Sequence, residues 1–203
     1  DDGLPLNGVE SICQDRQGHL WLTTNGEGIC RYDGATATTF TTADGLPDDR
    51  VRAVVEDRAG CIWYATAQGP CCCDGKTWTT WTAADGIAAG AALALLVDRG
   101  GRLWCGTAQG LSCFDGQAWT TFGATDGLAE GSVNALAEDS SGRIWCSTGS
   151  AVCRLDGRTW TAFTAADGIA QDHVWCIGTD PQGRVWVGGS GEGVGCFDGQ
   201  TWT

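Results

Sequence analysis

In this chain of 203 residues, one position of a recurring segment holds a chemically different side chain in each copy. It lies in a predicted strand, five residues before an Asp that opens a repeated turn. Side chains this varied and mostly polar could form an asymmetric ligand pocket if the fold brings them together, whereas a solvated channel wall would also tolerate the variation. The residues at this position are Glu10, Arg52, Leu93, Asn134 and Trp175.

His173 is one of only two histidines and stands two residues before Trp175. We therefore add it to the candidate ligand-binding residues, which are Glu10, Arg52, Asn134, His173 and Trp175.

Two further carboxylates are candidates because of where they lie. Glu27 and Glu192 occupy the second loops of the first and last repeats, which are one residue longer than the others. These carboxylates could contact a cation or sugar hydroxyls, or they could be solvated like most turn residues.

The sequence has no pattern typical of catalysis or of metal binding. A lyase or hydrolase needs a placed base with an acid or a metal, but His19 and His173 lie in different repeats. The spacings of zinc ligands and of calcium loops do not occur, and the glycine-rich residues 187–191 lack the helix and Lys that a phosphate loop needs. We predict no catalytic residue, no metal and no cofactor.

Twelve cysteines would suit a disulfide framework by count, but they fall at unrelated positions. The run from Cys71 to Cys73 cannot pair with itself, because successive side chains of a strand point to opposite faces. We interpret the cysteines as small buried apolar residues. One pair, Cys105 and Cys113, could face each other across a hairpin.

The net charge of −13 limits the partners of the chain. An acidic surface repels phosphate backbones and anionic lipids, so we expect no nucleic acid partner. No apolar run approaches the ~20 residues that cross a bilayer, so direct membrane insertion is not expected. The charge is compatible with an oligosaccharide or a protein partner.

A motif of seven residues organises the chain. It reads Asp, two variable residues, Gly, one variable residue, an aliphatic residue and Trp, and its five Trp residues are 42, 41, 41 and 41 positions apart. A fixed period of this length is typical of repeat arrays and of propeller blades. The five copies cover 15–21, 57–63, 98–104, 139–145 and 180–186.

Each repeat contains four short segments with strand character. In the third repeat these are 93–97, 102–107, 111–114 and 118–122, and Asp115-Gly116 between the last two is a strong hairpin signal. Four antiparallel strands cannot bury both faces alone, so the repeats must stack. We predict an all-β propeller of five four-stranded antiparallel blades, forming one domain over 1–203 with repeats near 1–41, 42–83, 84–124, 125–165 and 166–203.

Two arrangements of the five blades are open. They could close into a ring through side-chain packing between the first and last blades, or they could be part of a seven- or eight-bladed ring within a larger chain or assembly.

Eleven tryptophans suggest sugar stacking, but nine of them recur at two fixed positions of the repeat. A side chain that fills the same gap between adjacent blades would recur in this way, so we interpret these nine as core residues.

The stretch from Asp98 to Leu111, with Phe114 to Phe122 after it, resembles the two-component regulator propeller repeat. The resemblance extends over essentially the whole chain. It implies a β-propeller that serves as the extracytoplasmic sensor part of a bacterial regulator and responds to glycans. Related propellers include lyases that act on cyclic peptides.

These observations predict a non-catalytic recognition module. The resemblance implies that it binds carbohydrate and is located in the periplasm or at the cell surface. A structural subunit that docks onto a larger assembly is the alternative, and a lyase-type enzyme is a third hypothesis.

Overall fold

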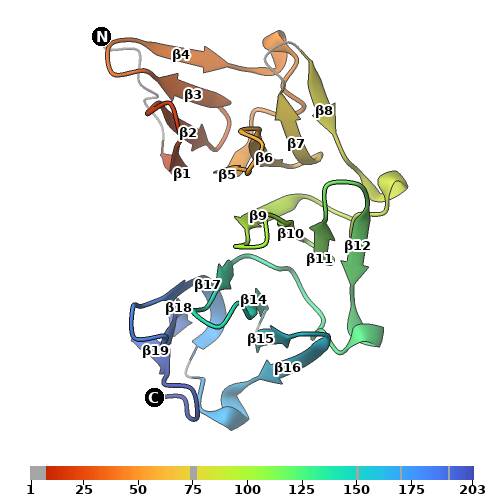
Figure 1. Cartoon of the computed structure of the whole chain (residues 1–203), viewed down its shortest axis with the longest axis vertical. Coiled ribbons are helices and arrows are strands. Elements are labelled where there is room, and N and C mark those ends of the chain that lie inside the picture. The colour runs from red at the N-terminus through yellow and green to blue at the C-terminus, as the bar shows by residue number, and fades with distance from the viewer. Residues whose placement is uncertain (1–7, 74–76, 150, 170, 192) are drawn as a thin grey trace.

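The computed structural model describes residues 8–73, 77–149, 151–169, 171–191 and 193–203, and these form five antiparallel sheets in chain order (Figure 1). The first sheet contains β1 (Val9–Gln14), β2 (Leu20–Thr24), β3 (Ile29–Tyr32) and β4 (Ala37–Phe40). The second contains β5 (Val51–Glu56), β6 (Ile62–Thr66), β7 (Gly69–Cys73) and β8 (Trp78–Thr80). The third contains β9 (Ala92–Val97), β10 (Leu103–Thr107), β11 (Gly110–Phe114) and β12 (Trp119–Phe122). The fourth contains β13 (Leu136–Glu138), β14 (Ile144–Thr148), β15 (Ala151–Asp156) and β16 (Thr159–Phe163). The fifth contains β17 (Gln171–Thr179), β18 (Val185–Gly191) and β19 (Val194–Phe197).

The prediction of four-stranded antiparallel meanders is confirmed for the first four sheets. In the fifth sheet, an isolated bridge between Phe197 and Trp202 stands where the fourth strand of the other sheets lies. Consecutive strands pair throughout, so each sheet is one blade of the predicted all-β architecture.

Short 3-10 helices connect the blades: η1 (Thr42–Asp44), η2 (Ala83–Asp85), η3 (Ala124–Asp126) and η4 (Ala165–Asp167). In η1 the Asp44 carboxylate accepts the backbone N–H of Thr41 at 2.9 Å. Gly45 ends the helix at φ 94°, a backbone conformation that favours glycine. The Asp-Gly pairs that connect consecutive blades therefore lie in capped helical turns.

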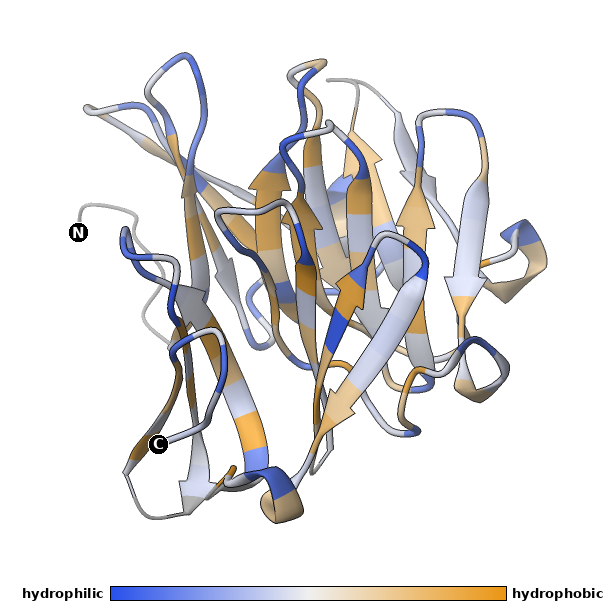
Figure 2. Cartoon of the chain, turned by 60° about the horizontal axis from the view of Figure 1, so that its bottom comes forward, coloured by the Kyte–Doolittle hydropathy of each residue, from blue (hydrophilic) through white to orange (hydrophobic). Residues whose placement is uncertain are grey.

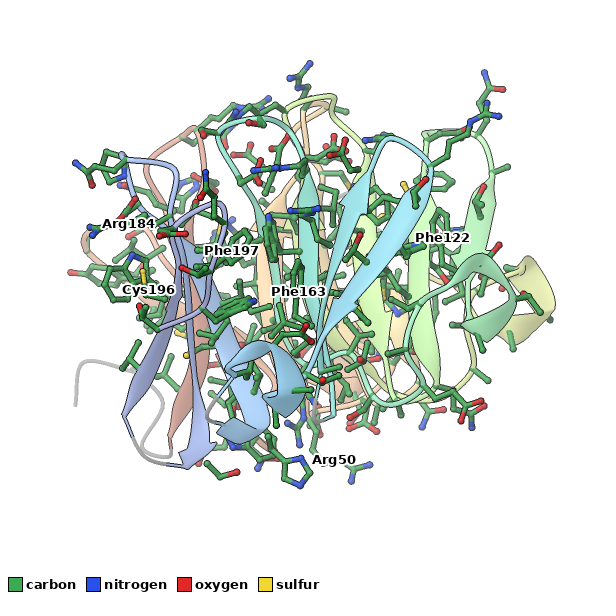
Figure 3. All side chains as sticks on the ribbon, turned by 90° about the horizontal axis from the view of Figure 1, so that it is seen from below. Arg50, Phe122, Phe163, Arg184, Cys196 and Phe197 are labelled. Atoms are coloured by element: carbon green, nitrogen blue, oxygen red, sulfur yellow. The ribbon has the colours of Figure 1, made fainter. Side chains whose placement is uncertain are left out.

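The blades pack face to face through apolar clusters, and the hydrophobic residues concentrate on the strands that face one another (Figure 2). Between the fourth and fifth blades, Trp145 packs against Val187, and the rings of Phe163 and Phe197 lie 5.3 Å apart (Figure 3). The tryptophans of the repeated motif therefore lie between blades, as expected for core residues.

Within the described chain, the outer faces of the first and fifth blades are not covered. Val9 is 42% exposed, whereas Val51 at the same position of the next blade is 0% exposed. At the other end, Val194 is 62% exposed and its counterpart Val152 is 0% exposed. The five blades follow an arc (Figure 1), and the described residues do not provide the packing between first and last blades that closure of a five-bladed ring requires.

The predicted pairing of Cys105 with Cys113 is wrong. In the β10–β11 ladder Cys105 stands opposite Ser112, so Cys113 lies one residue out of register and on the other face of the sheet. The register instead brings Cys146 opposite Cys153 in the β14–β15 ladder. All twelve cysteines are free thiols, and six of them are buried.

In the part of the chain that the structure describes, no helix has the length and apolar character needed to span a bilayer.

Candidate functional site

The variable first-strand position of each blade faces one shared hollow on the inner side of the arc. The hollow has a volume of about 240 Å³. It is lined by Glu10, Arg52, Leu93, Asn134 and Trp175. The structure thus brings together four of the seven candidate residues, one from each of four blades, and adds Leu93 from the third.

A β-bulge explains why these side chains point inward. The register of β1 with β2 shifts between Val9 and Ser11, which leaves Glu10 as the extra residue. The corresponding shifts occur around Arg52, Leu93 and Trp175. A bulge interrupts the alternation of side chains and redirects the extra residue, here toward the centre of the arc.

The fourth blade reaches the same result without a bulge in a named strand. Asn134 lies before β13, and its backbone N–H donates to Ser147 Oγ at 3.3 Å. The Asn134 side-chain Nδ2 donates to Ser132 Oγ at 3.0 Å, which fixes the amide at the wall of the hollow.

An adjoining hollow of about 380 Å³ shares Arg52, Asn134 and Trp175 and also contacts His173. The rings of His173 and Trp175 lie 6.1 Å apart in an edge-to-face arrangement, and Trp175 is 56% exposed. Buried tryptophans fill the blade interfaces of this chain, so an indole exposed at the axis is an exception to that role.

The charged groups of the site are available to a ligand. Neither Glu10 nor Arg52 makes an ion pair within the described chain, although both line the same hollow. The site therefore offers a carboxylate as an acceptor, a guanidinium as a donor and an indole as a stacking surface.

The two loop carboxylates are placed differently. The loop that carries Glu27 is hydrogen-bonded to the second repeat. The backbone N–H groups of Gly26 and Gly28 both donate to the carbonyl of Asp49, at 3.1 and 2.9 Å. Glu27 is half-buried and is not among the residues that line the two axial hollows. Glu192 lies outside the described residues.

His19 has a structural partner. Its Nδ1 lies 2.9 Å from Oδ2 of Asp15, at the position that arginine occupies in three later repeats. Burial raises the pKa of Asp15, but hydrogen bonds from Trp21 and His19 outweigh this effect, so the pKa lies below its ordinary value. His19 thus belongs to the repeated turn.

Among the described residues, no group of three or more His, Cys, Asp or Glu side chains is arranged to hold a metal ion.

The shared hollow could be expected from the five equivalent positions, but the bulges that aim them could not. Ser132 and Gly149, which line the adjoining hollow, were missed because they lie in loops of the fourth blade.

Solved structures with the same fold include extracellular domains of two-component systems. The extracellular domain of BT3049 from B. thetaiotaomicron, described as a hybrid two-component system, superposes with a TM-score of 0.82 at 22% identity, over 100% of this chain and 29% of that chain. The virginiamycin B lyase of Staphylococcus aureus gives a TM-score of 0.73 at 14% identity, over 98% of this chain and 70% of that chain. PorZ, a surface component of the type-IX secretion system of Porphyromonas gingivalis, gives 0.67 at 16% identity, over 95% of this chain and 32% of that chain.

At these identities the likeness extends to the fold alone, and the chain spans less than a third of the length of the BT3049 extracellular domain. No match was found among curated proteins.

The profile of the two-component regulator propeller matches residues 3–26, 45–68, 127–150 and 168–191. Each segment begins near the start of a repeat and ends after its second strand. The third repeat, whose residues 98–111 resemble the family motif most fully, is outside the matched segments. The chain therefore carries repeats of the two-component regulator propeller family.

Proposed function

We propose that the chain is the ligand-recognition part of a sensor propeller and that it binds a carbohydrate without catalysis. The observation that supports this proposal is the convergence of five equivalent but chemically different positions on one hollow. Residues that serve only the fold recur from blade to blade, as the motif Asp and Trp do, whereas these differ in every blade.

The chemistry of the hollow suits a sugar. The exposed face of Trp175 can stack on the apolar face of a pyranose ring, while Arg52 and Glu10 can donate to and accept from hydroxyls. The net charge of −13 favours a neutral ligand over a polyanion.

An extracytoplasmic location is part of the proposal. It is supported by the extracellular sensor domains that share the fold. The lyase and gluconolactonase propellers share it as well, so the fold by itself does not separate binding from catalysis. His173 contacts the ring of Trp175, which is the stacking surface of the proposed site.

The proposal is tested by intrinsic fluorescence during titration with a panel of neutral oligosaccharides. A saturable change is expected with at least one of them, and Trp175→Ala and Arg52→Ala should each abolish it. Arg50→Ala is the matched control, because Arg50 is exposed two residues away, pairs with Asp48 and does not line the two axial hollows. If no oligosaccharide produces a saturable change, the carbohydrate proposal fails. Turnover that is lost in His173→Ala would favour the enzyme hypothesis instead.

We also propose that the five blades belong to a larger ring. The uncovered apolar faces at Val9 and Val194 support this, because the same faces are buried between all interior blades. The lyase supports it too, since the chain covers 70% of its length and about seven repeats of this size would fill that propeller. Mass spectrometry of the native gene product is the test, and a mass close to that of these 203 residues would require the faces to be covered by a partner.

A docking subunit is the second candidate function, and the same two faces support it. An apolar strand face that remains open in the native protein would be an interaction surface.

A further inference from the structure

A second cavity lies between the first two blades, away from the axial hollows, and it is larger than either of them. Its volume is about 500 Å³, within the range of small-molecule sites. Trp21 and Phe40 form one wall, and Tyr64 and Trp78 form the other. These residues come from β2 and β4 of the first blade and from β6 and β8 of the second, the two sheets at the top of Figure 1.

The cavity exists because one residue breaks the internal symmetry. The third strand ends just before its Asp-Gly turn with Phe114, Leu155 and Phe197 in the last three blades, but with Cys73 in the second. Phe114 fills the next interface, with its ring 5.0 Å from Trp119 and 5.9 Å from Trp63. In the second blade the smaller thiol leaves that space open.

In the second blade, a larger side chain in the second strand fills only part of this space. Tyr64 occupies the position held by Cys105, Cys146 and Val187 in later blades. Its ring lies 5.9 Å from Trp21 and 5.7 Å from Trp78. Aromatic rings therefore line the cavity, which remains open on one side.

One polar donor at the cavity lacks a partner. The Nε of Arg31 is buried and has no hydrogen-bond partner in the described chain, and the guanidinium lies 5.9 Å from the centre of the Trp21 ring. Buried donors without an acceptor are costly, so a ligand that supplies one would be favoured.

Arg31 makes no ion pair within the described chain, although its charge contributes a little to the lowered pKa of Asp33. The carboxylate of Asp33 is engaged by the backbone N–H groups of Ala35 and Thr36, at 2.9 and 2.8 Å, and by the Thr36 hydroxyl at 3.0 Å. The positive charge beside the aromatic walls is therefore available to an anion.

We propose that the cavity between the first two blades binds a small aromatic carboxylate. The ring of the ligand takes the place that Phe114 fills in the next interface, and its carboxylate accepts from Arg31. This site is separate from the axial hollows, which use none of the same residues.

The probe is 2-naphthoate, titrated into the protein by calorimetry, with 2-naphthol as its neutral counterpart. Wild-type protein should bind 2-naphthoate saturably. Cys73→Phe, which fills the cavity with the side chain found at this position in two other blades, should abolish binding. Arg31→Gln should weaken 2-naphthoate binding about tenfold and leave 2-naphthol unchanged, because one charge-assisted hydrogen bond is lost.

Arg154→Gln is the matched control. Arg154 holds the equivalent position in the fourth blade, and its Nε also lacks a partner in the described chain. There, however, Phe197 of the fifth blade fills the interface, with its ring 5.4 Å from Trp145 and 5.3 Å from Phe163. This variant should bind 2-naphthoate like wild type, and so should Trp175→Ala, which separates this site from the proposed carbohydrate site.

If Cys73→Phe does not fold, Thr38→Trp provides the same test, since Thr38 is an exposed residue on the wall of the cavity and a larger side chain there should close it. Absence of saturable 2-naphthoate binding to wild type would overturn the proposal, as would unchanged binding in the folded variant that fills or closes the cavity. Equal affinity of Arg31→Gln and wild type would overturn the choice of an anion.

Discussion

The indole Nε1 of Trp104 donates a 2.9 Å hydrogen bond to Oδ2 of Asp98, and both side chains are almost completely buried. The other oxygen of the same carboxylate accepts the backbone N–H of Arg102 at 2.9 Å. One carboxylate thus closes the turn and fixes the indole that packs against the next blade. The same bond, at 2.7 to 2.9 Å, is present in all five repeats.

Replacing this carboxylate should destabilise the fold. In Asp98→Ala the buried indole N–H and the turn amide lose their acceptor, and we expect the free energy of unfolding to fall by about 3 kcal/mol. Urea denaturation measures the change. Asp115→Ala is the matched control, because Asp115 caps an exposed turn through two backbone N–H groups, and it should cost clearly less. Equal losses in the two variants would contradict a special role for the buried pair.

Acidic pH should reduce the stability that these motif carboxylates provide. Burial raises the pKa of Asp98 and of Asp139, but hydrogen bonds from the indoles and from neighbouring groups outweigh it, and both values lie below the ordinary range. A carboxyl with a lowered folded-state pKa contributes stability above its unfolded-state pKa of about 4 and loses it as the pH falls through the folded-state value. The free energy of unfolding should therefore decrease from about pH 4 downward, and the decrease should continue toward the pKa of about 2 of Asp180.

Urea midpoints measured at intervals from pH 5 to pH 2 check this dependence. Asp98→Asn should show a shallower decrease than wild type, because one of the titrating groups is gone. An identical slope would mean that the stability of the fold is lost through other carboxyls.

Equivalent valines of the first and second blades should contribute differently to the free energy of unfolding. Val51→Ala should lower the free energy of unfolding by about 2 kcal/mol, since it removes methyl groups from a packed blade interface. Val9→Ala makes the same change on the uncovered face of the first blade and should cost less than half as much. If both cost the same, the face of the first blade is covered in solution, and sedimentation would then reveal self-association.

Much of the architecture is predictable from the spacing of turn residues. The strand predicted at 93–97 is β9, Ala92–Val97, and the one predicted at 118–122 is β12, Trp119–Phe122. Asp-Gly turns and a period of 41 leave little freedom in where strands begin and end.

Features that depend on register or on side-chain volume were not predictable in the same way. Whether Cys105 and Cys113 face each other depends on the register around the turn at Ala108-Gln109. The ladder pairs Thr107 with Gly110 and hence Cys105 with Ser112. The cavity beside Cys73 depends on which ring fills each interface, and this cannot be assigned until the facing residues of two blades are known.

The cysteines should differ widely in reactivity. Cys176 is exposed, whereas Cys105 is buried and burial raises its pKa to about 12. A thiol reagent such as DTNB should label Cys176 first in the native protein, and Cys176→Ser should remove that fast phase. Cys105→Ser should leave the fast phase intact. A fast phase that survives Cys176→Ser would mean that one of the partly buried thiols is accessible in solution.

Truncation of two tryptophans at different places in the repeat should affect different properties, namely stability for Trp145 and ligand binding for Trp175. Trp145 is fully buried, donates to Asp139 at 2.8 Å and stacks with Phe163, so Trp145→Ala should cost about 4 kcal/mol of stability. Trp175 is 56% exposed at the axis, so Trp175→Ala should change the urea midpoint little while it removes ligand binding. A large loss of stability in Trp175→Ala would show that this indole packs like the others, and the axial site would then lack its stacking surface.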